Sequence, residues 1–201
     1  MLNEHTVTEG KTKTRYRLKA VGTTNTYAYC RIAARDALAQ AESAKSGAMY
    51  FCMMAGVFSA FTVEAFLNHL GRLKVRDWDT LERNKGPREK LEFLAASQNW
   101  QLPLGKRPFQ TLRQMVFLRN SLAHGKTETV VKQLVMSRPP KEGDRWPEAD
   151  WKKLCTVAVA KKMVEDAEAI VNDLSRRSGS PRDPLASLGH ARSGVEEIAD
   201  N

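Results

Sequence analysis

The sequence predicts an all-α protein, a bundle of four to five helices. Residues 27–45 are rich in alanine and favour a helix. Residues 48–74 continue as a long, largely apolar helical pattern. Near the end of the chain, apolar residues recur with heptad spacing and form one seam along a helix: Val157, Ala160, Val164, Ala167, Val171 and Leu174.

Proline, glycine and capping residues predict where these helices begin and end. Ser46-Gly47 separates the first two helices. A short third helix covers Pro87–Ala96, since proline suits the first helical position. Pro108 begins the fourth helix, and Gly125 is expected to be its C-cap. The last helix is expected over 150–174, with its aspartate as the N-cap.

The chain divides into three parts by composition. Residues 1–24 are a basic, polar N-terminal arm, 25–177 are the helical domain, and 178–201 are a tail in which Gly, Ser, Pro and Asp are interleaved. Such a tail is expected to be disordered. Within the domain, 75–87 are a charged segment that ends in a turn, and 127–137 fit a strand or a helix equally well.

The charge of the chain favours a polyanionic partner. Its 201 residues carry a net charge of +9, and the stretch 93–127 has no acidic residue. Basic surface of this kind binds RNA through its phosphates, although simple solubility explains the excess equally well. The candidate RNA contacts are Lys106, Arg107, Arg113 and Lys126.

The cysteines and the apolar segments indicate a cytoplasmic protein. Three widely separated cysteines without a CxxC spacing argue against a disulfide framework or a zinc site. The N-terminus has no secretory signal pattern. Residues 46–63 are uncharged and near the lower length limit for a membrane span, but they contain Ser, Gly and Thr and run directly into Glu64. A buried helix is therefore favoured, and a membrane-associated protein is the weaker alternative.

Two charged residues lie on the apolar stripes of the predicted helices. Glu64 falls among Val57, Phe61 and Leu67, and Arg119 falls on the face of the fourth helix that is expected to be buried. An unpaired buried charge is too costly to keep, so we expect Glu64 and Arg119 to pair. This pattern is equally compatible with an ion pair that only stabilises the helical bundle.

His124 favours a second, functional interpretation of the same helix. Histidine can accept and release a proton near neutral pH, and arginine is a permanent clamp for phosphate oxygens. Together they supply what RNA cleavage by its own 2′-hydroxyl requires. Asn120 lies one turn before His124 and is expected to orient it. A histidine at a helix C-terminus also interacts favourably with the helix dipole, which is a structural alternative.

The stretch "LRNSLAHGK", residues 118–126, resembles the signature of HEPN domains: an arginine, a polar residue (often asparagine), three further residues and a histidine. Residues 61–71 are similar to the acidic helix of many members, and 87–94 to the helix between the two. The resemblance implies a helical bundle that forms a homodimer, with one composite site built from both copies. It also implies that Arg119 and His124 are catalytic, that Asn120 supports them, and that Glu64 orients Arg119.

Two functions of different class follow from this resemblance. The first is a metal-independent endoribonuclease without a cofactor, acting on single-stranded RNA such as tRNA. It would serve as a toxin or in phage defence, with an antitoxin or a defence-system partner. The second is a non-catalytic helical dimer that binds RNA, a nucleotide or a protein. The apolar seam of the last helix and the uncharged second helix are a further reason to expect a homodimer.

Overall fold

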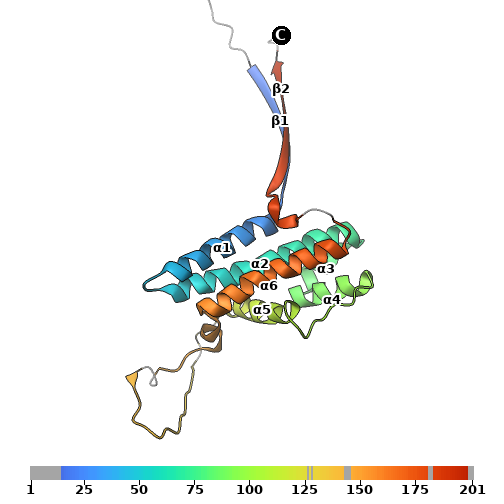
Figure 1. The fold of residues 1–201 in the computed structure, drawn as a ribbon. Helices are drawn as coiled ribbons and strands as arrows, with labels where there is room; N and C mark the ends of the chain where they lie inside the picture. The colour runs from blue at the N-terminus through green and yellow to red at the C-terminus, as the bar shows by residue number, and fades with distance from the viewer. Residues whose placement is uncertain (1–14, 126, 128, 143–145, 181–182, 199–201) are drawn as a thin grey trace, which may run out of the picture. The chain divides into compact units, whose positions relative to one another are not determined.

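A computed structural model describes residues 15–125, 127, 129–142, 146–180 and 183–198. Residues 25–188 form one compact helical unit, and the two strands outside it belong to a second unit. The described residues are mostly helical, as predicted, with a two-stranded sheet in addition (Figure 1). The α-helices are α1 Thr26–Ser43, α2 Ala48–Lys74, α3 Trp78–Asn84, α4 Pro87–Ser97, α5 Phe109–Ala123 and α6 Val157–Arg177. The short helices are η2 Asp150–Leu154 and η3 Pro184–Ala186, and the strands are β1 Arg15–Thr24 and β2 Gly189–Ile198.

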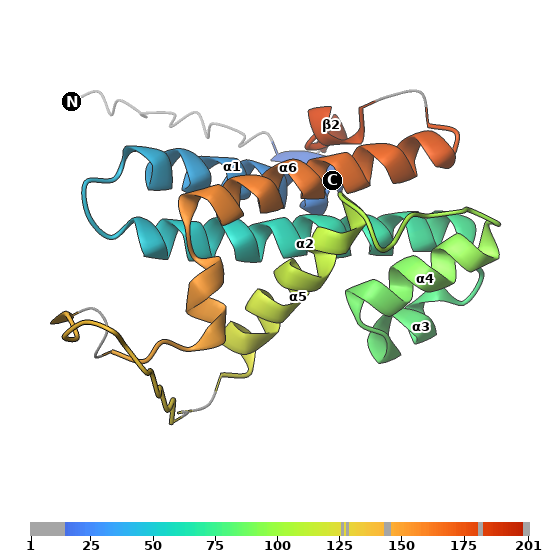
Figure 2. The same ribbon diagram turned by 60° about the horizontal axis from the view of Figure 1, so that its bottom comes forward.

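Helix α2 is the centre of the helical unit. It packs against α1 and α6 along much of its length and is crossed by α5, while α3 and α4 lie at its C-terminal half (Figure 2). Its buried face carries Val63, Phe66, Leu67 and Leu70, which lie in one continuous core with side chains from the other helices. Among the described residues, α2 is also the one helix long and apolar enough to cross a membrane, and half of its most apolar window is buried inside the protein.

Several helix boundaries agree with the sequence. The first two helices and the one that begins at Pro87 lie where they were predicted. The fourth helix begins one residue later than expected, at Phe109 with Pro108 as its N-cap. Helix α3 was not predicted, because its seven residues are mostly charged or polar. Its place is fixed by Trp78, which is buried against α2.

The predicted start of the last helix was wrong. Asp150 begins the 3-10 helix η2, and α6 begins only at Val157. Thr156 is the N-cap, and its hydroxyl accepts a hydrogen bond from the backbone N–H of Val159 at 3.4 Å. Aspartate and threonine are both good N-cap residues, so capping chemistry alone could not choose between them. The heptad seam, which begins at Val157, agrees with the later start.

The seam of α6 is buried inside its own unit. All its members except Val157 are at most 4% exposed: Ala160, Val164, Ala167, Val171 and Leu174. The seam therefore provides no surplus surface for a partner, and this part of the argument for a homodimer does not hold.

The two ends of the chain also differ from the prediction. The tail was expected to be disordered, but residues 189–198 form β2, antiparallel to β1 in a register that joins Leu18 to Val195 and Thr24 to Gly189. Leu18 and Val195 lie on one face, and Arg17 and Glu196 form an ion pair at 3.5 Å on the other. The pairing joins segments at opposite ends of the chain, so local composition could not indicate it. The described part of 127–137 has no regular secondary structure.

Gly71 is expected to be essential for the contact between α2 and α3. A Cβ atom at Gly71 would overlap the ring of Trp78. Gly71→Ala should therefore destabilise the protein by about 1–3 kcal/mol, in spite of a gain of about 1 kcal/mol in helix propensity. Urea denaturation followed by circular dichroism measures this change. Gly105→Ala is the control because a Cβ at Gly105 meets nothing within 4 Å, and equal stability of the two variants would contradict the prediction.

Candidate active site

The predicted ion pair between Glu64 and Arg119 is present. Nη2 of Arg119 on α5 donates a hydrogen bond to Oε2 of Glu64 on α2. The Arg119 side chain is only 18% exposed and the Glu64 side chain only 23%. Each charged residue lies on an otherwise apolar helix face, and these two faces meet where α2 and α5 cross. The pairing confirms the expectation that neither charge would be left alone in a buried position.

Lys90 is a third member of this cluster, and the sequence analysis missed it. Its Nζ lies 3.3 Å from Oε1 of Glu64, and its side chain is only 3% exposed. Lys90 lies on the buried face of α4 with Pro87, Leu91 and Leu94. The same signal that singled out Glu64, a charge on an apolar stripe, was therefore present at Lys90.

The cluster carries more positive than negative charge. Among the described residues, Glu64 is the one carboxylate that pairs with either Lys90 or Arg119. Nη1 of Arg119 donates a hydrogen bond to Oδ1 of Asn120 at 2.8 Å. Asn120 was expected to orient His124, but the hydrogen bond that its side chain makes within the described residues is to Arg119, and it meets His124 through its backbone carbonyl. The Nε of Arg119 is buried, with no hydrogen-bond partner in the described part of the chain. Such an arrangement attracts an anion and offers it a guanidinium in a fixed orientation.

His124 lies at the C-terminus of α5. It is the C-cap residue, its backbone N–H donates to the carbonyl of Asn120 at 3.0 Å, and its side chain is exposed. Gly125, expected as the C-cap, is instead the next residue. A Cβ there would lie 2.7 Å from the carbonyl oxygen of Ser121, so glycine is needed for this turn.

A cavity of about 520 Å³ surrounds His124, with Phe117, Glu148 and Trp151 among its walls. Arg119 does not line this cavity. The helical positions explain this, because ideal geometry places His124 about 140° around α5 from Arg119. Within a single chain the two predicted catalytic residues therefore lie on different sides of one helix.

The predicted RNA contacts fall into different environments. Lys106 and Arg113 are exposed, and Lys126 lies outside the described residues. Arg107 is engaged: its guanidinium donates to both carboxylate oxygens of Asp166 at 2.8–3.1 Å. These hydrogen bonds to Asp166 raise the pKa of Arg107. Much of its charge is therefore offset, which makes Arg107 the weaker phosphate contact.

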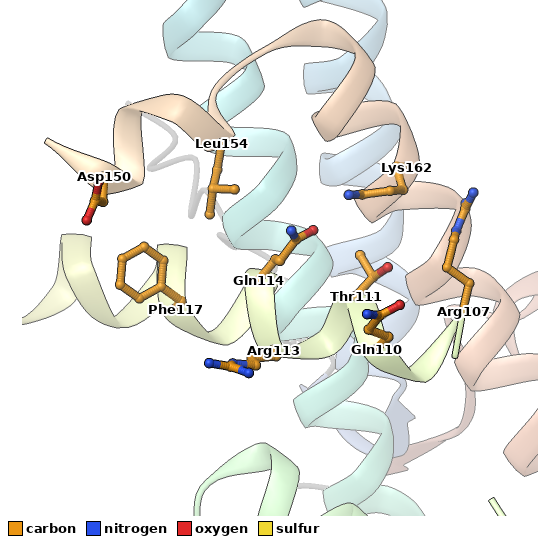
Figure 3. A pocket seen from close by; sticks show the side chains of 9 residues that line it. All are labelled: Arg107, Gln110, Thr111, Arg113, Gln114, Phe117, Asp150, Leu154 and Lys162. Carbon is orange, nitrogen blue, oxygen red and sulfur yellow. The ribbon is translucent and has the colours of Figure 1, made fainter. Parts of the chain in front are cut away.

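A second cavity, of about 600 Å³, lies beside the one at His124 (Figure 3). Helix α5 forms its floor, and η2 and α6 contribute Leu154 and Lys162. Phe117 and Asp150 line both cavities. The sequence analysis did not single out Phe117 or Lys162, because their shared cavity depends on the packing of segments far apart in the chain.

No family model matches the chain, and neither the curated proteins nor the solved structures include a significant match to it. Within the described residues, no group of three or more His, Cys, Asp or Glu side chains is placed to hold a metal ion.

The cluster predicts unequal effects for its two partners. Glu64→Gln would leave the buried Lys90 facing Arg119 without a counter-charge, so it should cost about 3–5 kcal/mol of unfolding free energy. Arg119→Gln should cost less, because Glu64 keeps Lys90 as its partner. Urea denaturation of both variants measures the difference. Adding Lys90→Met to Glu64→Gln should recover part of the loss, and a larger loss for Arg119→Gln than for Glu64→Gln would contradict this account.

Proposed function

We propose that the protein is a metal-independent endoribonuclease of the HEPN type. The observation that carries the proposal is the half-buried Arg119, held by Glu64, on the same helix whose end exposes His124. The first offers a fixed positive charge, and the second offers a group that can transfer protons. The intact motif of Arg119, Asn120 and His124 supports the same class.

The chemistry assigned to this site is an internal transfer at phosphorus. The 2′-oxygen of a ribose attacks the adjacent phosphate, and the bond from phosphorus to the 5′-oxygen of the next nucleotide breaks. His124 transfers the proton that leaves the 2′-hydroxyl or the proton that the 5′-oxygen gains. Arg119 stabilises the negative charge that develops on the non-bridging oxygens. The products are a 2′,3′-cyclic phosphate and a 5′-hydroxyl.

A homodimer is part of the proposal, because one chain places Arg119 and His124 on different sides of α5. Two copies can complete a site that neither forms alone. An exposed apolar stripe of α2 that lies beside Glu64 supports this, since it carries Tyr50, Met54 and Phe61, which are 61%, 43% and 37% exposed. Exposed apolar residues gathered on one helix face are typical of a surface that binds a protein.

The alternative is a non-catalytic helical dimer that binds RNA, a nucleotide or a protein partner. It is favoured by one observation, the absence of Arg119 from the cavity at His124. A role as a toxin or in phage defence, a tRNA substrate, an antitoxin or defence-system partner, and a cytoplasmic location are proposals that follow from the ribonuclease function.

His124→Ala separates the two functions. His124 is exposed and only caps a helix, so the variant should fold, keep its oligomeric state and bind RNA. Loss of the proton-transfer group should lower the rate of cleavage by about 10²–10⁴. The measurement is gel electrophoresis of a tRNA pool and a labelled single strand incubated with purified protein.

Three controls sharpen this assay. EDTA should leave the wild type active, and the products should carry 2′,3′-cyclic phosphate ends. His190→Ala, which changes a histidine of β2, should cut like the wild type. If the wild type cuts no RNA, or if His124→Ala cuts equally well, the binding module becomes the function to pursue.

Phe61→Glu tests the homodimer. A charge on the exposed stripe of α2 beside Glu64 should convert a dimer into a monomer, measured by light scattering at micromolar concentration. Cleavage should fall with the mass, because the composite site would be lost. Leu73→Glu is the matched control, since Leu73 is a 66% exposed residue of the same helix outside this stripe. A wild type that is itself monomeric, or a dimeric Phe61→Glu variant that remains active, would refute the composite site.

A further inference from the structure

The cavity of about 600 Å³ beside His124 has charges that no group in the described chain offsets. Arg113 and Lys162 line it from α5 and α6 (Figure 3), and within the described residues neither makes an ion pair. The other charged groups of the wall are engaged. Arg107 pairs with Asp166, and Asp150 pairs with Lys153 at 2.6 Å. Two uncommitted cations therefore face one cavity, which favours an anionic ligand.

Phe117 gives the same cavity an apolar, aromatic wall. Its side chain is 46% exposed although it lies in the middle of a helix. Figure 3 shows the ring with Leu154 of η2 above it, while the side chain of Arg113 extends from the lower edge of α5 in this view. Gln110 and Gln114 add amide groups that donate and accept hydrogen bonds. An exposed aromatic ring beside uncommitted cations is the combination that binds single-stranded nucleic acid, whose bases stack and whose phosphates are charged.

The cavity also has a defined position relative to His124. Phe117 and Asp150 line both this cavity and the one at His124, so the two cavities are neighbours on either side of these residues. Helix geometry separates Phe117 from His124 by about 10 Å along α5. A chain that passes His124 can therefore continue across Phe117 toward Lys162.

We propose that this cavity is a subsite for a nucleotide that flanks the cleavage position in single-stranded RNA. The base stacks on Phe117, and the neighbouring phosphates contact Arg113 and Lys162. A stacked duplex would not offer a free base to Phe117, so the subsite selects unpaired RNA. The proposal rests on the proposed ribonuclease function, and it adds how that site selects its substrate.

The test uses an RNA that the protein cannot cut. A fluorescein-labelled 2′-O-methyl hexaadenylate lacks the attacking hydroxyl, and its dissociation constant is measured by fluorescence anisotropy with the full chain. Phe117→Ala should weaken binding at least about fivefold, whereas Phe117→Trp should retain it. Lys162→Gln should weaken binding and lower the slope of log K against log salt by about 0.7.

Lys161→Gln is the matched control. Lys161 is the neighbouring residue on α6, is exposed and does not line the cavity, so its loss should leave binding and the salt slope close to those of the wild type. Unchanged thermal midpoints establish that each variant is folded. Wild-type affinity in both Phe117→Ala and Lys162→Gln, or no binding by the wild type, overturns the subsite. Equal affinity for 5′-AMP and the hexanucleotide also overturns it, in favour of a free-nucleotide site.

The cleavage assay on all-ribose RNA keeps the two proposals apart. If the wild type cuts RNA but the cavity variants bind and cut normally, the subsite is refuted and the ribonuclease stands. If the wild type binds through Phe117 and Lys162 but cuts nothing, the subsite is supported as a binding site and the ribonuclease is refuted.

Discussion

The carboxylate of Glu64 joins three helices, because it accepts hydrogen bonds from Arg119 of α5 and Lys90 of α4 while it is itself part of α2. This contact fixes how α5 is rotated about its axis. With Arg119 turned toward α2, helix geometry directs Arg113, Phe117 and His124 outward within an arc of about 40°. The residues that can meet a ligand are therefore placed outward by the ion pair together with the buried Leu112, Met115 and Leu118 of the same helix. A rotation of α5 that exposed Arg119 would also withdraw this outward set.

A second contact anchors the other end of the same helix. Asp166 of α6 is 4% exposed and accepts hydrogen bonds from Arg107, just before α5, and from the hydroxyl of Thr111 in its first turn. Helix α5 is thus tied to α6 at its N-terminus and to α2 near its C-terminus. Between these two contacts, the outward face of α5 lies beside η2 and Lys162. A groove held at both ends can present cations and an aromatic ring in a fixed arrangement, which lowers the entropic cost of ordering them around a ligand.

The sequence predicted features that depend on one helix at a time. A charge on an apolar stripe of a long helix must find a partner, and this argument alone paired Glu64 with Arg119. Lys90 carries the same signal, a charge on the buried face of the short helix α4. The cavity with Phe117 and Lys162 could not be predicted from the sequence, because it depends on where η2 and α6 pack. The pairing of β1 with β2 could not be predicted either. Isolated strands give only a weak local signal in the sequence, and these two lie at opposite ends of the chain.

The balance of charge decides how far the ion pair can be regarded as purely structural. A pair that only stabilises a bundle is complete when one cation meets one carboxylate, and a further half-buried cation adds desolvation cost without a matching gain. Here Lys90 is almost fully buried and takes one oxygen of Glu64, so Arg119 is left with a shared counter-charge and an unpartnered Nε. An anion that approaches Arg119 would restore the balance. Phosphate suits this position because its oxygens match the guanidinium fork, and in the proposed homodimer His124 of a second copy would be the side chain that acts on the phosphodiester.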